Sequence, residues 1–181
     1  MVAFATPDDL AERLQVEFDV DDYVRATGLI EQASGLVQRT TRQTITQVVG
    51  DVITLPATYT SLLMLPELPV TAVASLVYDG STWTDGTDYA WTTSGLIVTA
   101  GRYAAIWSRP TVVTYTHGYA TVPDDIVSIV IDMSARAWQN PRGVLSEQIG
   151  TYSARYPAGQ TGLTVMPDEA MLLHQYRPVP G

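Results

Sequence analysis

Few side chains in this sequence could make or break covalent bonds. It contains no cysteine and no lysine, and all ten basic residues are arginine. Thiolate nucleophiles, cysteine-ligated metals, Schiff-base lysines and P-loop lysines are therefore excluded. The two histidines, His117 and His174, stand in different parts of the chain, and nothing in their spacing suggests a metal site. We expect His117 to be an ordinary strand residue and His174 to lie on a helix surface.

Acidic residues are the remaining candidates for catalysis or metal binding. The acids at 19–22 and 85–88 lack the full EF-hand pattern, and a helix start and a turn explain them. The acids at 124–125, 147 and 168–169 could supply a glycosidase-type pair, but each has a capping position or lies in a loose segment. No G-x-S-x-G or H-E-x-x-H motif is present. We expect no enzymatic activity, no cofactor and no metal, with an acidic hydrolase as the remaining catalytic alternative.

Composition narrows the class of protein further. The chain has 181 residues, of which 46% are hydrophobic, and a formal net charge of −9. It is long enough for one domain with a real core, or one domain with an arm. An acidic chain without a basic cluster is a poor candidate for a nucleic-acid-binding protein, because affinity for nucleic acid comes largely from neutralising phosphates. We expect no membrane-spanning helix and no secretory signal, because no long apolar run and no basic n-region are present.

Helix-start signals place four helices. The Thr6-Pro7-Asp8-Asp9 string predicts a helix over 7–16, and the acids at 19–22 predict a longer one over 20–41. Pro123 and the acids after it predict a helix over 123–139, where Asp132 and Arg136 have the spacing of an ion pair. Apolar residues, among them Ile129, Met133 and Trp138, cover more than half of its circumference. We therefore expect its own sheet and another subunit to cover it.

The segment 44–117 is typical of β-structure. Short apolar runs separated by turn signals predict about six strands in a small antiparallel sheet or barrel. We expect tight turns at Gly50-Asp51, Asp79-Gly80 and Ser94-Gly95. The aromatic residues of this zone favour core or interface positions, although a carbohydrate-binding module is an alternative; they are Trp83, Tyr89, Trp91, Tyr103 and Trp107.

These predictions add up to an α+β protein. Residues 1–140 are predicted to form one core domain, in which helices 20–41 and 123–139 pack on the β zone. Residues 141–181 are predicted to form an extended Gly/Pro-rich arm. The arm carries a short helix over 167–177, which must dock on something to be stable.

Several strings, taken in their order, resemble the head–tail connector (adaptor) proteins of long-tailed bacteriophages, of the actinobacteriophage type. The strings are Gln38-Arg39-Thr40-Thr41-Arg42, Leu65-Pro66-Glu67-Leu68-Pro69-Val70, Val77-Tyr78-Asp79-Gly80, Val113-Thr114-Tyr115-Thr116-His117-Gly118-Tyr119, Val122-Pro123-Asp124-Asp125-Ile126, Glu147-Gln148-Ile149-Gly150-Thr151-Tyr152-Ser153-Ala154-Arg155-Tyr156 and Leu163-Thr164. The resemblance spans most of the chain. The family's typical members are largely helical, whereas this chain has the β zone of residues 44–117.

The resemblance implies a structural role in the neck of a virion, with synthesis in the host cytoplasm. Such proteins form a ring, usually of twelve copies, between the portal protein and a stopper or tail-completion protein. DNA passes through the ring without sequence-specific binding, and an acidic lumen would let it slide. We expect the arm to contact the portal, and the apolar helix to contact the neighbouring copy. The expected interface residues are Tyr152, Tyr156, Leu172, Tyr176, Ile129, Met133 and Trp138. Another neck or tail-completion part is the alternative within the virion.

Overall fold

The computed structural model describes residues 2–100, 106–141, 146–149, 152–155 and 162–178, with the backbone alone at 146–149 and 152–155. Contacts within the chain divide it into two compact units. The helical unit comprises Met1–Arg42 and Val122–Arg177, and the β unit comprises Gln43–Thr121 with Pro178–Gly181. The α+β class is confirmed. The prediction of one core domain over residues 1–140 stays a prediction.

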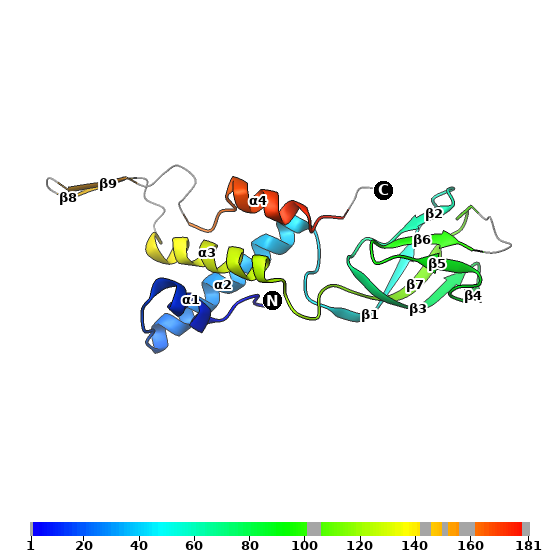
Figure 1. The fold of residues 1–181 in the computed structure, drawn as a ribbon, viewed down its shortest axis with the longest axis horizontal. Helices are drawn as coiled ribbons and strands as arrows, with labels where there is room; N and C mark the ends of the chain where they lie inside the picture. The colour runs from blue at the N-terminus through cyan, green and yellow to red at the C-terminus, as the bar shows by residue number, and fades with distance from the viewer. Residues whose placement is uncertain (1, 101–105, 142–145, 150–151, 156–161, 179–181) are drawn as a thin grey trace. The chain divides into compact units, whose positions relative to one another are not determined.

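The helical unit contains four helices that begin at or next to the predicted residues (Figure 1). Their bounds are α1 Pro7–Leu14, α2 Val20–Thr41, α3 Asp124–Gln139 and α4 Pro167–His174. The side chains of Thr6 and Asp19 accept the backbone N–H groups of Asp9 and Asp22, which completes a capping box on α1 and on α2. Both α1 and α4 end earlier than predicted, at residues 14 and 174.

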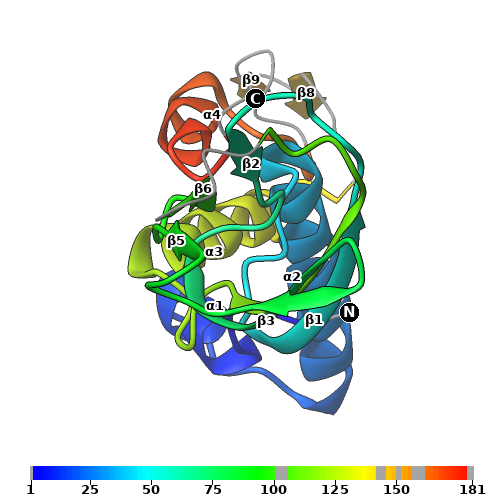
Figure 2. The same cartoon turned by 90° about the vertical axis from the view of Figure 1, so that its right-hand side faces the viewer.

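The third helix, α3, is the centre of this unit. It packs against α1, α2 and α4, and Figure 2 shows it between α1 and α4. The fully buried residues on these four helices include Leu10, Ile30, Val37, Ile126, Val130, Met133 and Leu173. Other helices of the same chain therefore cover much of the broad apolar arc of α3. Apolar faces of the four helices thus cover one another, and the expectation that the sheet also covers this arc stays a prediction.

The β unit holds two antiparallel sheets in its described residues. The first has the strand order β1-β7-β3-β4, and the second has the order β2-β6-β5. Alternate residues of β7 are buried, from Thr111 to His117, as its predicted face requires. The strand bounds are β1 Val48–Leu55, β2 Leu62–Met64, β3 Val70–Tyr78, β4 Ser81–Trp83, β5 Tyr89–Trp91, β6 Leu96–Thr99 and β7 Thr111–His117.

Two of the three predicted turns are confirmed. Asp79 and Gly80 join β3 to β4 with φ angles of 50° and 76°, the left-handed pair that a two-residue hairpin favours. Gly95, at φ 77°, turns β5 into β6. The turn at Gly50-Asp51 is wrong. Gly50 lies inside the single strand β1, where the register with β7 shifts between Val48 and Asp51, so glycine here accommodates a bulge.

A short hairpin interrupts the region predicted as an irregular arm. Its strands are β8 Ser146–Ile149 and β9 Tyr152–Arg155, paired antiparallel. A two-stranded hairpin is marginally stable alone in water, because it has no sheet face to bury. The rest of the predicted arm includes α4, which belongs to the helical unit.

Candidate partner-binding surface

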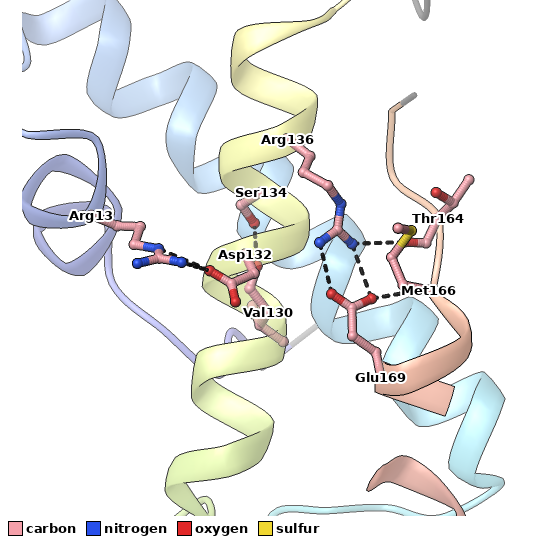
Figure 3. Close-up of polar contacts among 8 residues, drawn as sticks. All are labelled: Arg13, Val130, Asp132, Ser134, Arg136, Thr164, Met166 and Glu169. Atoms are coloured by element: carbon pink, nitrogen blue, oxygen red, sulfur yellow. Dashed lines mark hydrogen bonds and ion pairs between the residues drawn. The ribbon is translucent and has the colours of Figure 1, made fainter. Parts of the chain in front are cut away.

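Two ion pairs join α3 to its neighbouring helices (Figure 3). Asp132 Oδ1 accepts from Arg13 of α1, at 2.7 Å from Nη2 and 2.9 Å from Nε. One turn later, Arg136 makes a two-point contact with Glu169 of α4, at 2.7 and 3.0 Å. The predicted pair between Asp132 and Arg136 is wrong, because each residue pairs with another helix. A two-point contact between partly buried groups is stronger than an exposed pair along one helix.

The contact between Arg136 and Glu169 fixes the start of α4. These side chains are 20% and 12% exposed, whereas those of Arg13 and Asp132 are 59% and 41% exposed. Glu169 Oε2 also accepts the backbone N–H of Met166 at 2.8 Å, and Arg136 donates to the carbonyl of Thr164 at 3.0 Å (Figure 3). One partly buried carboxylate therefore caps α4 and binds it to α3.

The C-terminal end of α4 is held by Asp125, an acidic residue in the first turn of α3. The Tyr176 hydroxyl donates to Asp125, with O–O distances of 2.6 and 2.7 Å, and Gln175 Nε2 lies 2.9 Å from the same carboxylate. Arg177 Nε donates to the carbonyl of Thr40 at 2.9 Å, and Leu173 is fully buried. The short helix thus docks on its own chain, and Tyr176 anchors it there.

The predicted interface residues fall into three groups. Ile129 and Met133 are 5% and 0% exposed, so packing within the chain accounts for both. Leu172 is half exposed on α4 and is available to a partner. Tyr152 lies in β9, where only the backbone is described, and Tyr156 lies outside the described residues.

Trp138 is partly buried at the end of α3, against the α1–α2 corner. Its ring stacks on Phe18 at a centroid distance of 4.8 Å, and the Arg25 guanidinium lies 4.0 Å from the ring centroid. Arg25 also donates to the Trp138 carbonyl at 3.0 Å. Sequence reasoning missed Arg25, because its partner is more than one hundred positions away and no local pattern links them. Trp138 therefore has a role inside the helical unit.

The acids proposed as a catalytic pair have structural partners in this geometry. Asp125 binds Tyr176 and Gln175, and Glu169 binds Arg136. An open groove between α1 and α3 is polar, but its lining includes the ion pair described above; its residues are Asp9, Glu12, Arg13, Gln15, Ser128, Ile131 and Asp132. Among the described residues, no group of three His, Asp or Glu side chains could hold a metal ion. No described helix is long and apolar enough to cross a membrane.

The aromatic side chains of the β unit are largely internal. Trp107 and Tyr89 are 1% and 2% exposed, and Trp107 packs against Tyr78 and Trp83 at centroid distances of 5.3 Å. Burial, followed by the nearby Asp85, raises the pKa of Tyr89. Trp91 packs partly buried against the same core, and Tyr103 lies outside the described residues. This packing favours a core role over a sugar-binding platform, as predicted.

The two histidines lie where the sequence places them. His174 is exposed on α4, and His117 is 2% exposed at the end of β7. His117 Nε2 lies 3.4 Å from a carboxylate oxygen of Asp51, and its ring lies 4.9 Å from that of Tyr115. Burial raises the pKa of Tyr115 to about 12, with smaller contributions from the Asp51 and Glu67 carboxylates. This cluster is packed in the β unit, and its residues do not converge on a substrate site.

The described residues thus define an α+β protein whose charged and aromatic groups hold elements together. No family matches the sequence, and no curated protein matches it either. Solved structures do resemble its fold. A chain in the neck of an empty GTA particle, computed with C6 symmetry, matches with a TM-score of 0.59 at 16% identity, over 97% of this chain and 90% of that chain.

Two further chains give similar likenesses. One belongs to the virion of a native gene transfer agent (GTA) particle, with a TM-score of 0.58 at 15% identity, over 97% of this chain and 90% of that chain. The other belongs to the neck of a native GTA particle computed with C12 symmetry, with a TM-score of 0.53 at 15% identity, over 96% and 88%. At these identities the likeness shows a shared fold, including both the helices and the β zone.

Proposed function

We propose that this protein is a structural subunit of the neck of a tailed-phage-type particle, forming a ring adaptor between the portal and a stopper or tail-completion protein. The observation that carries the proposal is the fold likeness to chains of GTA necks, which spans 97% of this chain. Such coverage means that the β zone is part of the shared fold, although typical adaptors are largely helical.

The symmetry of those particles supports self-association. The necks were computed with C6 and C12 symmetry, and a cyclic assembly joins one surface of each copy to a different surface of the next. Twelve copies of a chain with a net charge of −9 would carry a formal charge of −108. Such a ring would repel DNA phosphates, so DNA passes through the channel without being held.

A non-enzymatic role is supported by how the acidic and aromatic residues are used. Asp132 and Glu169 each bind an arginine of another helix, and Asp125 binds Tyr176 just after α4. Two of the aromatic residues considered for sugar binding, Tyr89 and Trp107, are enclosed in the core of the β unit. The acidic-hydrolase and carbohydrate-binding alternatives need these same side chains to face a substrate.

The portal contact belongs to the β8–β9 region in this proposal. The helix α4 docks on α2 and α3, so we assign the portal contact to the other part of the predicted arm, the hairpin that contains Tyr152. Deleting all of 142–181 would also remove Glu169 and Leu173 from the helical unit. The informative variant therefore replaces residues 142–161 with a Gly/Ser linker of equal length and keeps α4.

The proposal is tested with the genome that encodes this chain. Removing its gene should leave filled heads that are not joined to tails, and wild-type protein supplied in trans should restore joined particles in electron micrographs. Purified protein should co-purify with the portal, and light scattering should give a ring mass in that complex. The linker variant should remain folded by circular dichroism and lose portal binding. Joined particles without this gene would refute the neck role, while portal binding by the linker variant would refute only the hairpin assignment.

A further inference from the structure

The helical unit carries exposed apolar residues at one end. Val16 and Val20, next to the α1–α2 corner, are 48% and 80% exposed, and Val24 is 71% exposed one turn further along α2. Exposed acidic residues flank them in the sequence, at Glu17, Asp19 and Asp21, while the exposed Arg25 is held over the Trp138 ring. We call these three valines and three acids the acidic end. Asp19 caps α2, so part of this charge also serves the helix.

A second apolar patch lies on α4. Met171 is 76% exposed and Leu172 is 50% exposed, on a helix whose neighbouring Leu173 is fully buried. The bond from Arg177 to the Thr40 carbonyl places this helix beside the last turn of α2. Exposed arginines gather there, at Arg39, Arg42 and Arg177. We call these five residues the basic end; two acids border it, Asp168 one turn before Met171 and Asp125, which binds Gln175 and Tyr176.

The acidic end and the basic end are separated along α2. The α1–α2 corner and α4 lie at opposite ends of the helical unit in both views (Figures 1 and 2). Helix α2 connects them, and its 22 residues span about 33 Å. The same copy cannot satisfy both patches, because they are too far apart to touch.

We infer that the acidic end of one copy docks against the basic end of the next, head to tail, with the three valines packed on Met171 and Leu172. Each end combines an apolar patch with charges opposite to those of the other, which fits a second copy of this chain. Two different surfaces joined head to tail generate a closed ring when the rotation closes. This inference rests on the proposed function, which supplies the ring, and it adds which two surfaces join neighbouring copies in that ring.

The contact is small, because only five apolar side chains contribute to it. A stable interface of standard size uses about 20–30 residues on each side. The free protein is therefore mostly monomeric at low concentration, and the contact forms when a partner concentrates the copies or when the salt concentration is low.

Crosslinking tests this inference directly, since the chain has no cysteine of its own. The double variant Val20→Cys with Met171→Cys should react with a short bis-maleimide to give a ladder beyond the dimer. Each copy then has two different reactive ends, which are too far apart for a crosslink within one copy. The matched control is Val20→Cys with Gln32→Cys, which keeps one end and moves the other thiol to an exposed position midway along α2.

Charge reversal supplies the second arm. Asp21→Arg should lower the ladder yield on the order of tenfold, because it places like charges across the contact. Adding Arg39→Glu should restore it. Both positions are exposed and neither is a capping residue, so the helix should persist in circular dichroism. Ladders equal to those of the control, or efficient dimers from Val20→Cys alone, would overturn the inference.

The failure of this contact and the failure of the neck role are distinguishable. If the chain occupies the neck as a ring and the double variant gives no ladder even in purified necks, the contact is wrong and the neck role stands. If the ladder and its charge-swap rescue appear but the chain is absent from purified necks, the contact stands and the neck role fails.

Discussion

Replacing Glu169 with alanine should strongly destabilise the helical unit. The change removes both contacts to Arg136 and the acceptor for the Met166 N–H, and leaves the Arg136 guanidinium with the Thr164 carbonyl. Removing one partner of a fully buried ion pair costs about 3–5 kcal/mol. Since these side chains are 20% and 12% exposed, solvent screens part of this loss. We expect a cost of about 2–3 kcal/mol.

The matched control is the exposed ion pair between Asp132 of α3 and Arg13 of α1. Asp132→Ala removes the contact to Arg13, and these side chains are 59% and 41% exposed. Exposed pairs contribute about 0–1 kcal/mol, so this variant should lie within 1 kcal/mol of wild type. Each variant removes one carboxylate. The carboxylate of Glu169 is the more buried one and binds α4 to α3, whereas that of Asp132 binds α1 to α3.

Urea unfolding followed by circular dichroism at 222 nm measures both variants, because this signal reports the helices. Tryptophan fluorescence gives a second trace, weighted toward Trp83, Trp91 and Trp107 of the β unit. We expect Glu169→Ala to lower the midpoint of the helical trace much more than Asp132→Ala does. Adding Arg136→Met should recover part of the loss, since it removes the charge left without its partner. Equal midpoints for the two alanine variants would refute the docking of α4 described above.

Three further changes test the β unit. Gly118→Ala should lower the free energy of unfolding in urea by more than about 2 kcal/mol, because a Cβ at φ +82° would lie 2.5 Å from the Thr46 carbonyl oxygen. The control Gly80→Ala, at φ +76° in open space, should cost only about 1–2 kcal/mol. Equal costs would contradict the close approach of Gly118 to Thr46. Tyr115, with its pKa raised to about 12, keeps its proton longer in the folded state, so stability should fall as pH rises from about 10 through 12. Tyr115→Phe should make that fall smaller, while the raised pKa of Tyr89 leaves part of it, and an unchanged pH profile would contradict the role of Tyr115. Trp107→Ala should cost about 3–5 kcal/mol of unfolding free energy, since the side chain is 1% exposed, and a cost below 1 kcal/mol would show that it does not fill the core.

Local signals in the sequence predicted the element starts well. The caps at Thr6 and Asp19 and the hairpin at Asp79-Gly80 depend on residues within four positions of one another, so their chemistry can be read directly. Gly50 shows the limit of this reading. A glycine followed by an aspartate is compatible with both a turn and a bulge, and pairing of β1 with β7 decides between them.

The candidate surface was less predictable, because it depends on contacts between distant residues. Asp132 and Arg136 have ideal spacing for a pair, yet Arg13 and Glu169 compete for them from other helices. The apolar breadth of α3 predicts a surface that a sheet and a neighbouring copy cover. The helices α1, α2 and α4 cover much of this apolar surface, and the sequence alone does not determine which apolar faces pack together.

The charge asymmetry of the helical unit follows from ordinary helix chemistry. Acids gather at the α1–α2 corner because α2 begins there, and carboxylates at a helix start accept otherwise unpaired N–H groups and interact favourably with the helix dipole. Arg39 lies where α2 ends, near its partial negative charge. A surface suited to head-to-tail assembly can thus arise from residues that already stabilise the fold. It follows that Asp19→Ser, which keeps a capping oxygen and removes a charge, should weaken association while preserving the helix, so the two roles of this residue are separable.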